Sequence, residues 1–306
     1  MYYLYYSANF LSSITKYALV CLLLIPALCY SQQNVLTVIS GDNQIYQHFY
    51  SELESGLNES HTLTKVHSHN INDDTFEKYD LIISIGSRAA KTIANYEVQQ
   101  TVIYTLIPDN ESLLNTVTCK VSNCYSVYIN QPAIRYVELF NALFTENHRL
   151  VLASTRANTK ISKQLLVATK KNKTLFKEIH VDQHGNVARS LINQLNSNDI
   201  LLALPDAAIY NATHSKNIIL SAYHKNIPII AYSKAFAKAG ALISLYSSIE
   251  DIAEQTSSLV NTIHNNGKQE QKEYYPDEFS IEINSAVARS LNLSIDSKNA
   301  IMRKIK

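Results

Sequence analysis

Polar residues follow directly on apolar runs of the sequence, where open α/β sheets place their ligand-binding groups. Gly86 and Ser87 follow the run 81–85, and Asp206 follows the run 200–204. The backbone N–H groups and the hydroxyl of Gly86 and Ser87 would suit a carboxylate or another anion. The Asp206 carboxylate would suit an ammonium group. Either Ser87 or Asp206 could instead simply cap the helix that follows it.

A further apolar run ends at Tyr232 and Ser233, which offer an aromatic face and a hydroxyl. Thr105 and Gln131 are expected near the same ligand site. An anion-binding turn, an opposed carboxylate and an aromatic wall together suggest a zwitterion, such as an amino acid, as the ligand.

Sequence motifs of enzymes are scarce. The phosphate-binding Gly-rich fingerprints and the Gly-x-Ser-x-Gly elbow are absent, as is any nucleophile–base arrangement, so we expect no enzyme activity. His67 and His69 could bind a metal from one strand face, but no carboxylate or Cys completes a ligand shell. We therefore expect neither a metal nor a cofactor.

The charge and the length of the chain further limit its possible functions and the number of its domains. The chain has 306 residues, with 27 Lys and Arg against 26 Asp and Glu, so its net charge is +1. No surplus positive charge exists to attract nucleic acid. The length predicts one large domain or two modest ones. We expect a monomer.

Residues 1–31 have the pattern of a secretory signal peptide. Lys16 precedes the short apolar run 17–25, and polar Gln32 follows the segment. The run is too short to span a bilayer, which takes about 20 residues. An uncleaved N-terminal anchor is the alternative. We expect cleavage and a periplasmic mature protein.

Cysteine usage agrees with export. Two of the four cysteines lie in the leader, which leaves Cys119 and Cys124 as a close pair. In a secreted chain such a pair predicts a disulfide that closes a small loop. A zinc site would need two further ligands, and none lies at the usual spacing.

From residue 34 onward, short β-branched runs alternate with helical patterns. This alternation predicts parallel sheets covered by helices on both faces, arranged as two Rossmann-like lobes joined by a hinge. We expect residues 32–127 and 234–306 to form lobe 1 and residues 128–233 to form lobe 2. A chain that crosses between lobes more than once makes a hinge with a cleft, a favoured place for small ligands.

Four segments, in order, resemble a group of ABC-transporter substrate-binding proteins. The stretch 199–206 followed by Tyr210-Asn211 is similar to the signature D-x-L-L-A-L-P-D-x-x-x-Y-N, and segments 81–89, 127–135 and 239–250 match as well. The match covers about residues 34–293. The resemblance implies a type I periplasmic binding protein, similar to the tryptophan/tyrosine-type group, that closes on a small ligand between its lobes. Tyr210, as part of the signature, joins the candidate ligand-binding residues.

Two functions agree with this resemblance. The first is a solute receptor that delivers its ligand, an amino acid by the family's example, to an ABC permease. The second is a periplasmic sensor or adaptor of the same fold that feeds a membrane signalling protein. The fold does not separate them, because function lies in sites and partners.

Overall fold

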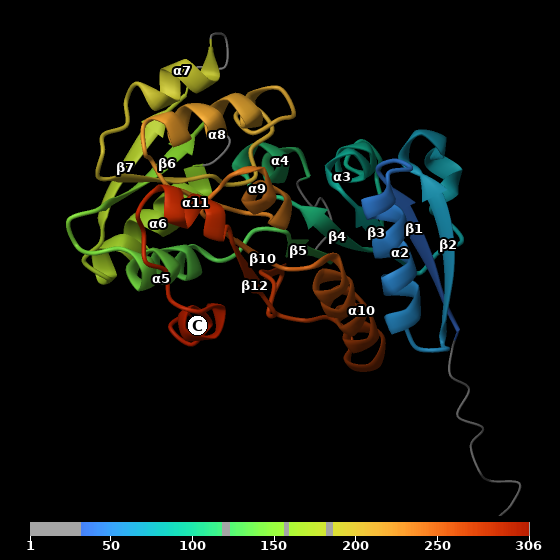
Figure 1. Cartoon of the computed structure of the whole chain (residues 1–306). Coiled ribbons are helices and arrows are strands. Elements are labelled where there is room, and N and C mark those ends of the chain that lie inside the picture. The colour runs from blue at the N-terminus through green and yellow to red at the C-terminus, as the bar shows by residue number, and fades with distance from the viewer. Residues whose placement is uncertain (1–31, 118–122, 156–158, 182–185, 306) are drawn as a thin grey trace, which may run out of the picture. The chain divides into compact units, whose positions relative to one another are not determined.

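A computed structural model describes residues 32–117, 123–155, 159–181 and 186–305 of the chain. The expected signal peptide and Cys119 lie outside these residues. The described chain forms two six-stranded sheets with interleaved helices (Figure 1). The expectation of mostly parallel α/β sheets is thereby confirmed.

The first sheet has the strand order β11-β5-β4-β3-β1-β2, and every neighbouring pair is parallel. Its strands are β1 (Gln33–Ile39), β2 (His61–His67), β3 (Leu81–Ile85), β4 (Thr101–Ile107), β5 (Cys124–Tyr128) and β11 (Glu273–Tyr274). The helices that go with it are α2 (Gln44–Gly56), α3 (Ser87–Ile93), α4 (Glu111–Thr116) and α10 (Ile249–Asn266), with 3-10 turns at Ser68–Asn70 and Asp73–Thr75.

The second sheet has the order β12-β10-β9-β8-β6-β7, parallel except for β12 against β10. Its strands are β6 (Arg149–Ser154), β7 (Leu175–His180), β8 (Asp199–Leu202), β9 (Ile229–Ala231), β10 (Ile243–Tyr246) and β12 (Ser280–Ile283). Its helices are α5 (Ala133–Leu143), α6 (Thr159–Lys171), α7 (Val187–Ile192), α8 (His214–His224), α9 (Lys234–Ala239), α11 (Ser285–Ser290) and α12 (Lys298–Met302).

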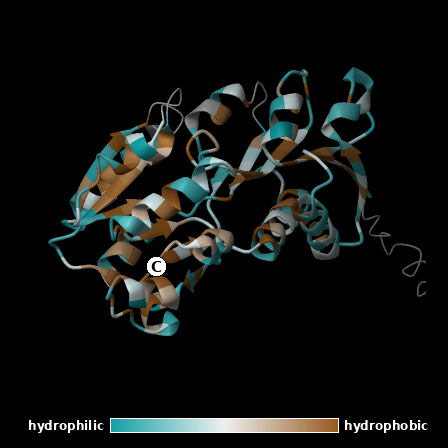
Figure 2. Ribbon diagram, turned by 45° about the horizontal axis from the view of Figure 1, so that its top comes forward, coloured by the Kyte–Doolittle hydropathy of each residue, from teal (hydrophilic) through white to brown (hydrophobic). Residues whose placement is uncertain are grey.

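Burial on both faces explains why the strands read as continuous apolar runs. All five residues of β3 are buried, and successive strand residues point to opposite faces of the sheet. Ile83 packs with Phe49 of α2, whereas Ile82 packs with Ala89 of α3 on the other face. The apolar colour in Figure 2 is accordingly concentrated along the strands.

The segment after residue 233, which we expected to return to lobe 1, divides between the sheets. Helix α10 packs on α2, and β11 extends the first sheet beside β5. Strands β10 and β12 instead pair within the second sheet. The apolar residues Ile243 and Leu245 of β10 are fully buried there, next to Ile230 of β9. The boundary of the two lobes stays a prediction.

The chain passes between the two sheets three times: after β5, after β10 and after β11. Gln131 in the first crossing donates from Nε2 to Ser247 Oγ in the second, over 2.7 Å. Ser247 in turn donates to the carbonyl of Glu278 in the third. Arg135 donates to Gln131 Oε1 (2.8 Å) and to the Pro276 carbonyl (2.6 Å). These bonds join all three crossings, an arrangement typical of a hinge.

An ion pair joins helices α2 and α10. His48 Nε2 lies 2.6 Å from Glu250 Oε1, and both side chains are exposed. The hydrogen bond to Glu250 raises the pKa of His48 above its ordinary value of 6.5. The same bond, before smaller contributions from the backbone and Ser248, lowers the pKa of Glu250 to about 2.

We expect Gly86→Ala to destabilise the fold. Gly86 has φ +86°, and an added Cβ would lie 2.7 Å from both Ser40 Oγ and Tyr46 Oη. Backbone strain of this kind costs about 1–3 kcal/mol. Urea unfolding of residues 32–306 measures the loss. Gly41→Ala is the matched control, since nothing lies within 4 Å of its Cβ; equal stability of the two variants would contradict the prediction.

The His48–Glu250 pair predicts a pH dependence of known sign. The contribution of His48 to stability is fully present below pH 6.5 and is lost as the pH rises through its raised pKa. The contribution of Glu250 is present above pH 4.5 and is lost as the pH falls towards about 2. An NMR titration should place the midpoint of His48 above 6.5.

The Glu250→Gln variant should bring that midpoint back towards the ordinary value. Glu254→Gln, a charge change at an exposed position of the same helix, should leave it unchanged. A wild-type midpoint at or below 6.5 would rule out the ion pair in solution.

Candidate functional site

Each sheet has a point where the order of its strands reverses. In the first sheet β1 lies between β2 and β3, and in the second β6 lies between β7 and β8. Connections from the two sides of such a point leave in opposite directions, so a crevice opens at the carboxyl ends of the strands. The predicted site residues Ser87 and Asp206 follow β3 and β8, next to these two points.

Ser40, at the end of β1, bridges the reversal point of the first sheet. Its hydroxyl donates to the carbonyl of Ile85 (2.8 Å) and accepts from the backbone N–H of Ala89 (2.9 Å). Gly86 occupies the cap position of α3, and Ser87 is the first helical residue. The alternative of a simple N-cap by Ser87 is therefore wrong. Ser40 fills part of that role across the sheet, a long-range pairing that sequence analysis missed.

Asp206 makes the equivalent bridge in the second sheet. Its Oδ2 accepts from Thr155 Oγ1 (2.6 Å), and Thr155 directly follows β6. Its Oδ1 accepts from the backbone N–H of Ala208 (2.9 Å). Asp206 thus closes a turn and does not cap α8, whose cap position is Thr213. The Asp206 residue is buried.

Two tyrosines lie close to Asp206. The backbone N–H of Tyr210 donates to the Asp206 carbonyl (2.7 Å), and the Tyr210 hydroxyl is buried with no hydrogen-bond partner in the described part of the chain. Burial, and secondly the negative charge of Asp206, raise the pKa of Tyr210 and of Tyr232. The rings of both tyrosines pack on Phe236. Asp206 therefore lies in an environment rich in hydroxyl groups.

Thr105 and Gln131 are both completely buried. The Thr105 hydroxyl lies 3.0 Å from the hydroxyl of Thr256, so it faces α10 from the first sheet. Gln131 bonds Ser247 and Arg135 within the crossings. The structure places these two residues in the core and in the hinge, and neither lines the pocket described next.

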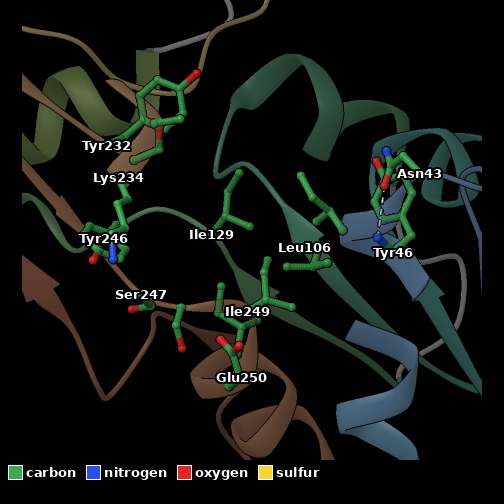
Figure 3. A pocket seen from close by; sticks show the side chains of 15 residues that line it. Asn43, Tyr46, Leu106, Ile129, Tyr232, Lys234, Tyr246, Ser247, Ile249 and Glu250 are labelled. Atoms are coloured by element: carbon green, nitrogen blue, oxygen red, sulfur yellow. Dashed lines mark hydrogen bonds between the residues drawn. The ribbon is translucent and has the colours of Figure 1, made fainter. Parts of the chain in front are cut away.

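A pocket of about 670 Å³ lies at the carboxyl ends of the strands of both sheets (Figure 3). Tyr232 and Ser233, both predicted, line it, whereas Ser87, Asp206 and Tyr210 do not. In Figure 3, Tyr232, Lys234 and Tyr246 lie across from Tyr46 and Asn43. The lining residues are Asn43, Ile45, Tyr46, Leu106, Ile129, Tyr232, Ser233, Lys234, Ala235, Tyr246, Ser247, Ser248, Ile249, Glu250 and Ile252.

Three helices begin at this pocket. Asn43, Ser233 and Ser248 cap α2, α9 and α10, each by accepting a backbone N–H three residues on. Helix N-termini carry a partial positive charge, so the pocket favours an anionic group. The sequence signal for Asn43 and Ser248 was available, since each is a capping residue that follows a strand.

The charged side chains of the pocket come from opposite sides. Lys234 of α9 forms a long ion pair, 4.0 Å to Glu282. Glu250 of α10 is held by His48. The aromatic rings of Tyr46, Tyr232 and Tyr246 supply apolar surface between these charges.

The histidine cluster does not form a metal site in the described ranges. His67 Nε2 lies 3.1 Å from Asp42 Oδ1, and the rings of His67 and His69 are 5.4 Å apart. Across residues 32–117, 123–155, 159–181 and 186–305, no group of three or more His, Cys, Asp or Glu side chains could hold a metal ion. In the same ranges no helix has the length and apolar character needed to cross a membrane.

Solved structures share the fold. A conserved domain protein from Vibrio cholerae O1 biovar El Tor is similar with a TM-score of 0.62 and 14% identity, over 90% of this chain and 99% of that one. An ABC domain from Streptococcus pneumoniae in complex with L-Trp is similar with a TM-score of 0.63 and 16% identity, over 89% of this chain and 98% of that one. The ligand-free, open structure of a Clostridium difficile substrate-binding protein with adhesive properties has a TM-score of 0.65 and 16% identity, over 88% of this chain and 97% of that one.

These likenesses establish the architecture, which is that of the type I periplasmic binding proteins. No curated protein sequence matches the chain. The family model for ABC transporter substrate-binding proteins matches residues 50–302, most of the chain. The chain therefore belongs to the ABC transporter substrate-binding protein family.

Proposed function

We propose that this protein captures an amino acid in the pocket of about 670 Å³ and delivers it to an ABC permease. The observation that carries the proposal is the position of the pocket, at the carboxyl ends of both sheets, in a chain of this family. Pockets of 300–1,000 Å³ are typical of small-molecule sites.

The chemistry of the walls supports a zwitterion. The starts of α2, α9 and α10, together with Lys234, favour a carboxylate. The Glu250 carboxylate favours an ammonium group, and Asp206, which does not line the pocket, adds to this attraction when the lobes close. The tyrosine rings offer a surface for an apolar or aromatic side chain. The Streptococcus pneumoniae ABC domain with the same fold is in complex with L-Trp, which makes L-tryptophan the first probe.

The predicted residues take different parts in this proposal. Tyr232 and Ser233 contact the ligand directly, because they line the pocket. Ser87, Asp206 and Tyr210 lie at the strand-order reversals and reach the ligand when the lobes close on it. Ligand binding would stabilise the closed form, which the permease recognises, by a shift of populations.

The remaining features of the proposal concern the whole protein. It acts as a monomer without a cofactor and catalyses no reaction. Its leader, residues 1–31, is cleaved on export, and Cys119 and Cys124 form a disulfide in the periplasm. A membrane sensor in place of the permease is the alternative partner, which the same fold would serve.

Tyr232→Ala should weaken ligand binding by tenfold or more, because it removes an aromatic wall of the pocket. A thermal-shift panel of the twenty amino acids selects the ligand, and calorimetry gives its Kd. Tyr223→Ala is the matched control, since Tyr223 is an exposed tyrosine on α8. Wild-type affinity in the Tyr232→Ala variant would exclude this pocket as the site.

Asp206→Asn should reduce the preference for a ligand that carries an amino group. Hydrogen bonds to charged groups contribute about 1.5–3 kcal/mol, or roughly 10- to 100-fold in Kd. Calorimetry compares L-tryptophan with its deaminated analogue, indole-3-propionate, in the wild type and in the variant. Asp74→Asn, an exposed charge change, is the control. An unchanged preference in Asp206→Asn would remove Asp206 from ammonium recognition.

A further inference from the structure

A second polar cluster lies outside the pocket, where α6 of the second sheet meets the edge of the first. Lys160, near the start of α6, places Nζ 3.1 Å from Asp109 Oδ1 and 2.8 Å from Glu273 Oε2. Asp109 follows β4, and Glu273 lies in β11. The lysine of one sheet thus pairs with two acids of the other. We call Lys160, Asp109, Glu273, Tyr275 and Gln164 the Lys160 clasp.

The clasp is a built arrangement around a buried charge. The Asp109 side chain is fully buried. The Tyr275 hydroxyl donates to Asp109 Oδ2 and accepts from Gln164 Nε2 of α6 over 3.0 Å. The Asp109 backbone N–H donates to Asn130 Oδ1 (2.6 Å), next to the first crossing. A buried carboxylate that loses its cation is left uncompensated, so the position of Lys160 matters energetically.

Lys160 and Glu273 each stabilise the charged form of the other. Burial lowers the pKa of Lys160, but its bonds to Glu273 and Asp109 more than offset that effect. Burial likewise raises the pKa of Glu273, which Lys160 and Tyr128 then bring below its ordinary value. Lys160 and Glu273 are therefore charged together at neutral pH.

The pocket is open in this structure, in which the clasp is formed. Ile45 is 55% exposed, and the side chains of Lys234 and Glu250 are 53% and 55% exposed, although all three line the pocket. Closure on a ligand would cover such residues. It would also turn α6 relative to β4 and β11 about the crossings, and an ion pair holds only while its atoms stay within about 4 Å.

We propose that the Lys160 clasp holds the two sheets in this open arrangement and is released when they close. None of its members lines the pocket, so the clasp would set the balance of open and closed forms without touching the ligand. The inference rests on the proposed function for its biological meaning only. Ligand affinity would then be reduced by the free energy needed to open the clasp.

Distances between the lobes in ligand-free protein test the proposal. Spin labels at Glu77→Cys and Lys216→Cys, both exposed and one beside each sheet, report the distance distribution by pulsed electron resonance. Lys160→Met should move population to the closed distances, by about five- to tenfold in the ratio of the two forms, or roughly 1–1.4 kcal/mol. Glu273→Gln should give a smaller shift of the same sign.

Lys163→Met is the matched control, because Lys163 is an exposed lysine of the same helix. It should match the wild type, and Lys160→Arg should stay close to it. A Lys160→Met distribution equal to the wild type, or an equal shift in Lys163→Met, would overturn the clasp. Since the readout needs no ligand, a failure to bind amino acids would overturn the proposed function and leave this test intact.

Discussion

The hydrogen bond from Gln131 to Ser247 links two of the three crossings between the sheets. The apolar core divides into four buried clusters, and in the described residues each cluster belongs to one sheet only. No shared core joins the sheets there, so their relative position relies on the crossings and a few polar contacts. Gln131, Ser247 and Arg135 tie those crossings together, in an arrangement typical of a hinge.

A joint of this kind makes ligand capture a balance between two sets of polar contacts. The Lys160 clasp lies beside the crossings and favours the open pocket, whereas a ligand would bridge the starts of α2, α9 and α10. A ligand can shift the balance only by the difference in its affinity for the two forms. A stronger clasp therefore favours the open form, and stronger polar contacts between ligand and pocket favour the closed form.

The fold could be predicted because its signals are local. The buried run of β3 and the glycine that follows it identify a strand and a turn without any partner being known. The division of the tail could not be read in this way, because β10 and β11 are both short strands and only pairing assigns them to different sheets.

The site was only partly predictable for the same reason. Tyr232 and Ser233 line the pocket, and the ends of apolar runs mark both of them in the sequence. Gln and Thr are residue types that often bind ligands. Their hydrogen-bond partners show instead that Gln131 faces the crossings and that Thr105 faces α10. Ser40 and Lys160 act through residues 45 or more positions away in the sequence, which no local pattern reveals.

Native mass spectrometry of residues 32–306, purified without denaturation, tests directly whether the pocket is a ligand receptor. We expect one small molecule bound per chain, released on unfolding and identified as an amino acid or a related zwitterion. A bare polypeptide mass, with no amino acid able to restore a bound species, would contradict the claim that this pocket is a receptor for such a ligand.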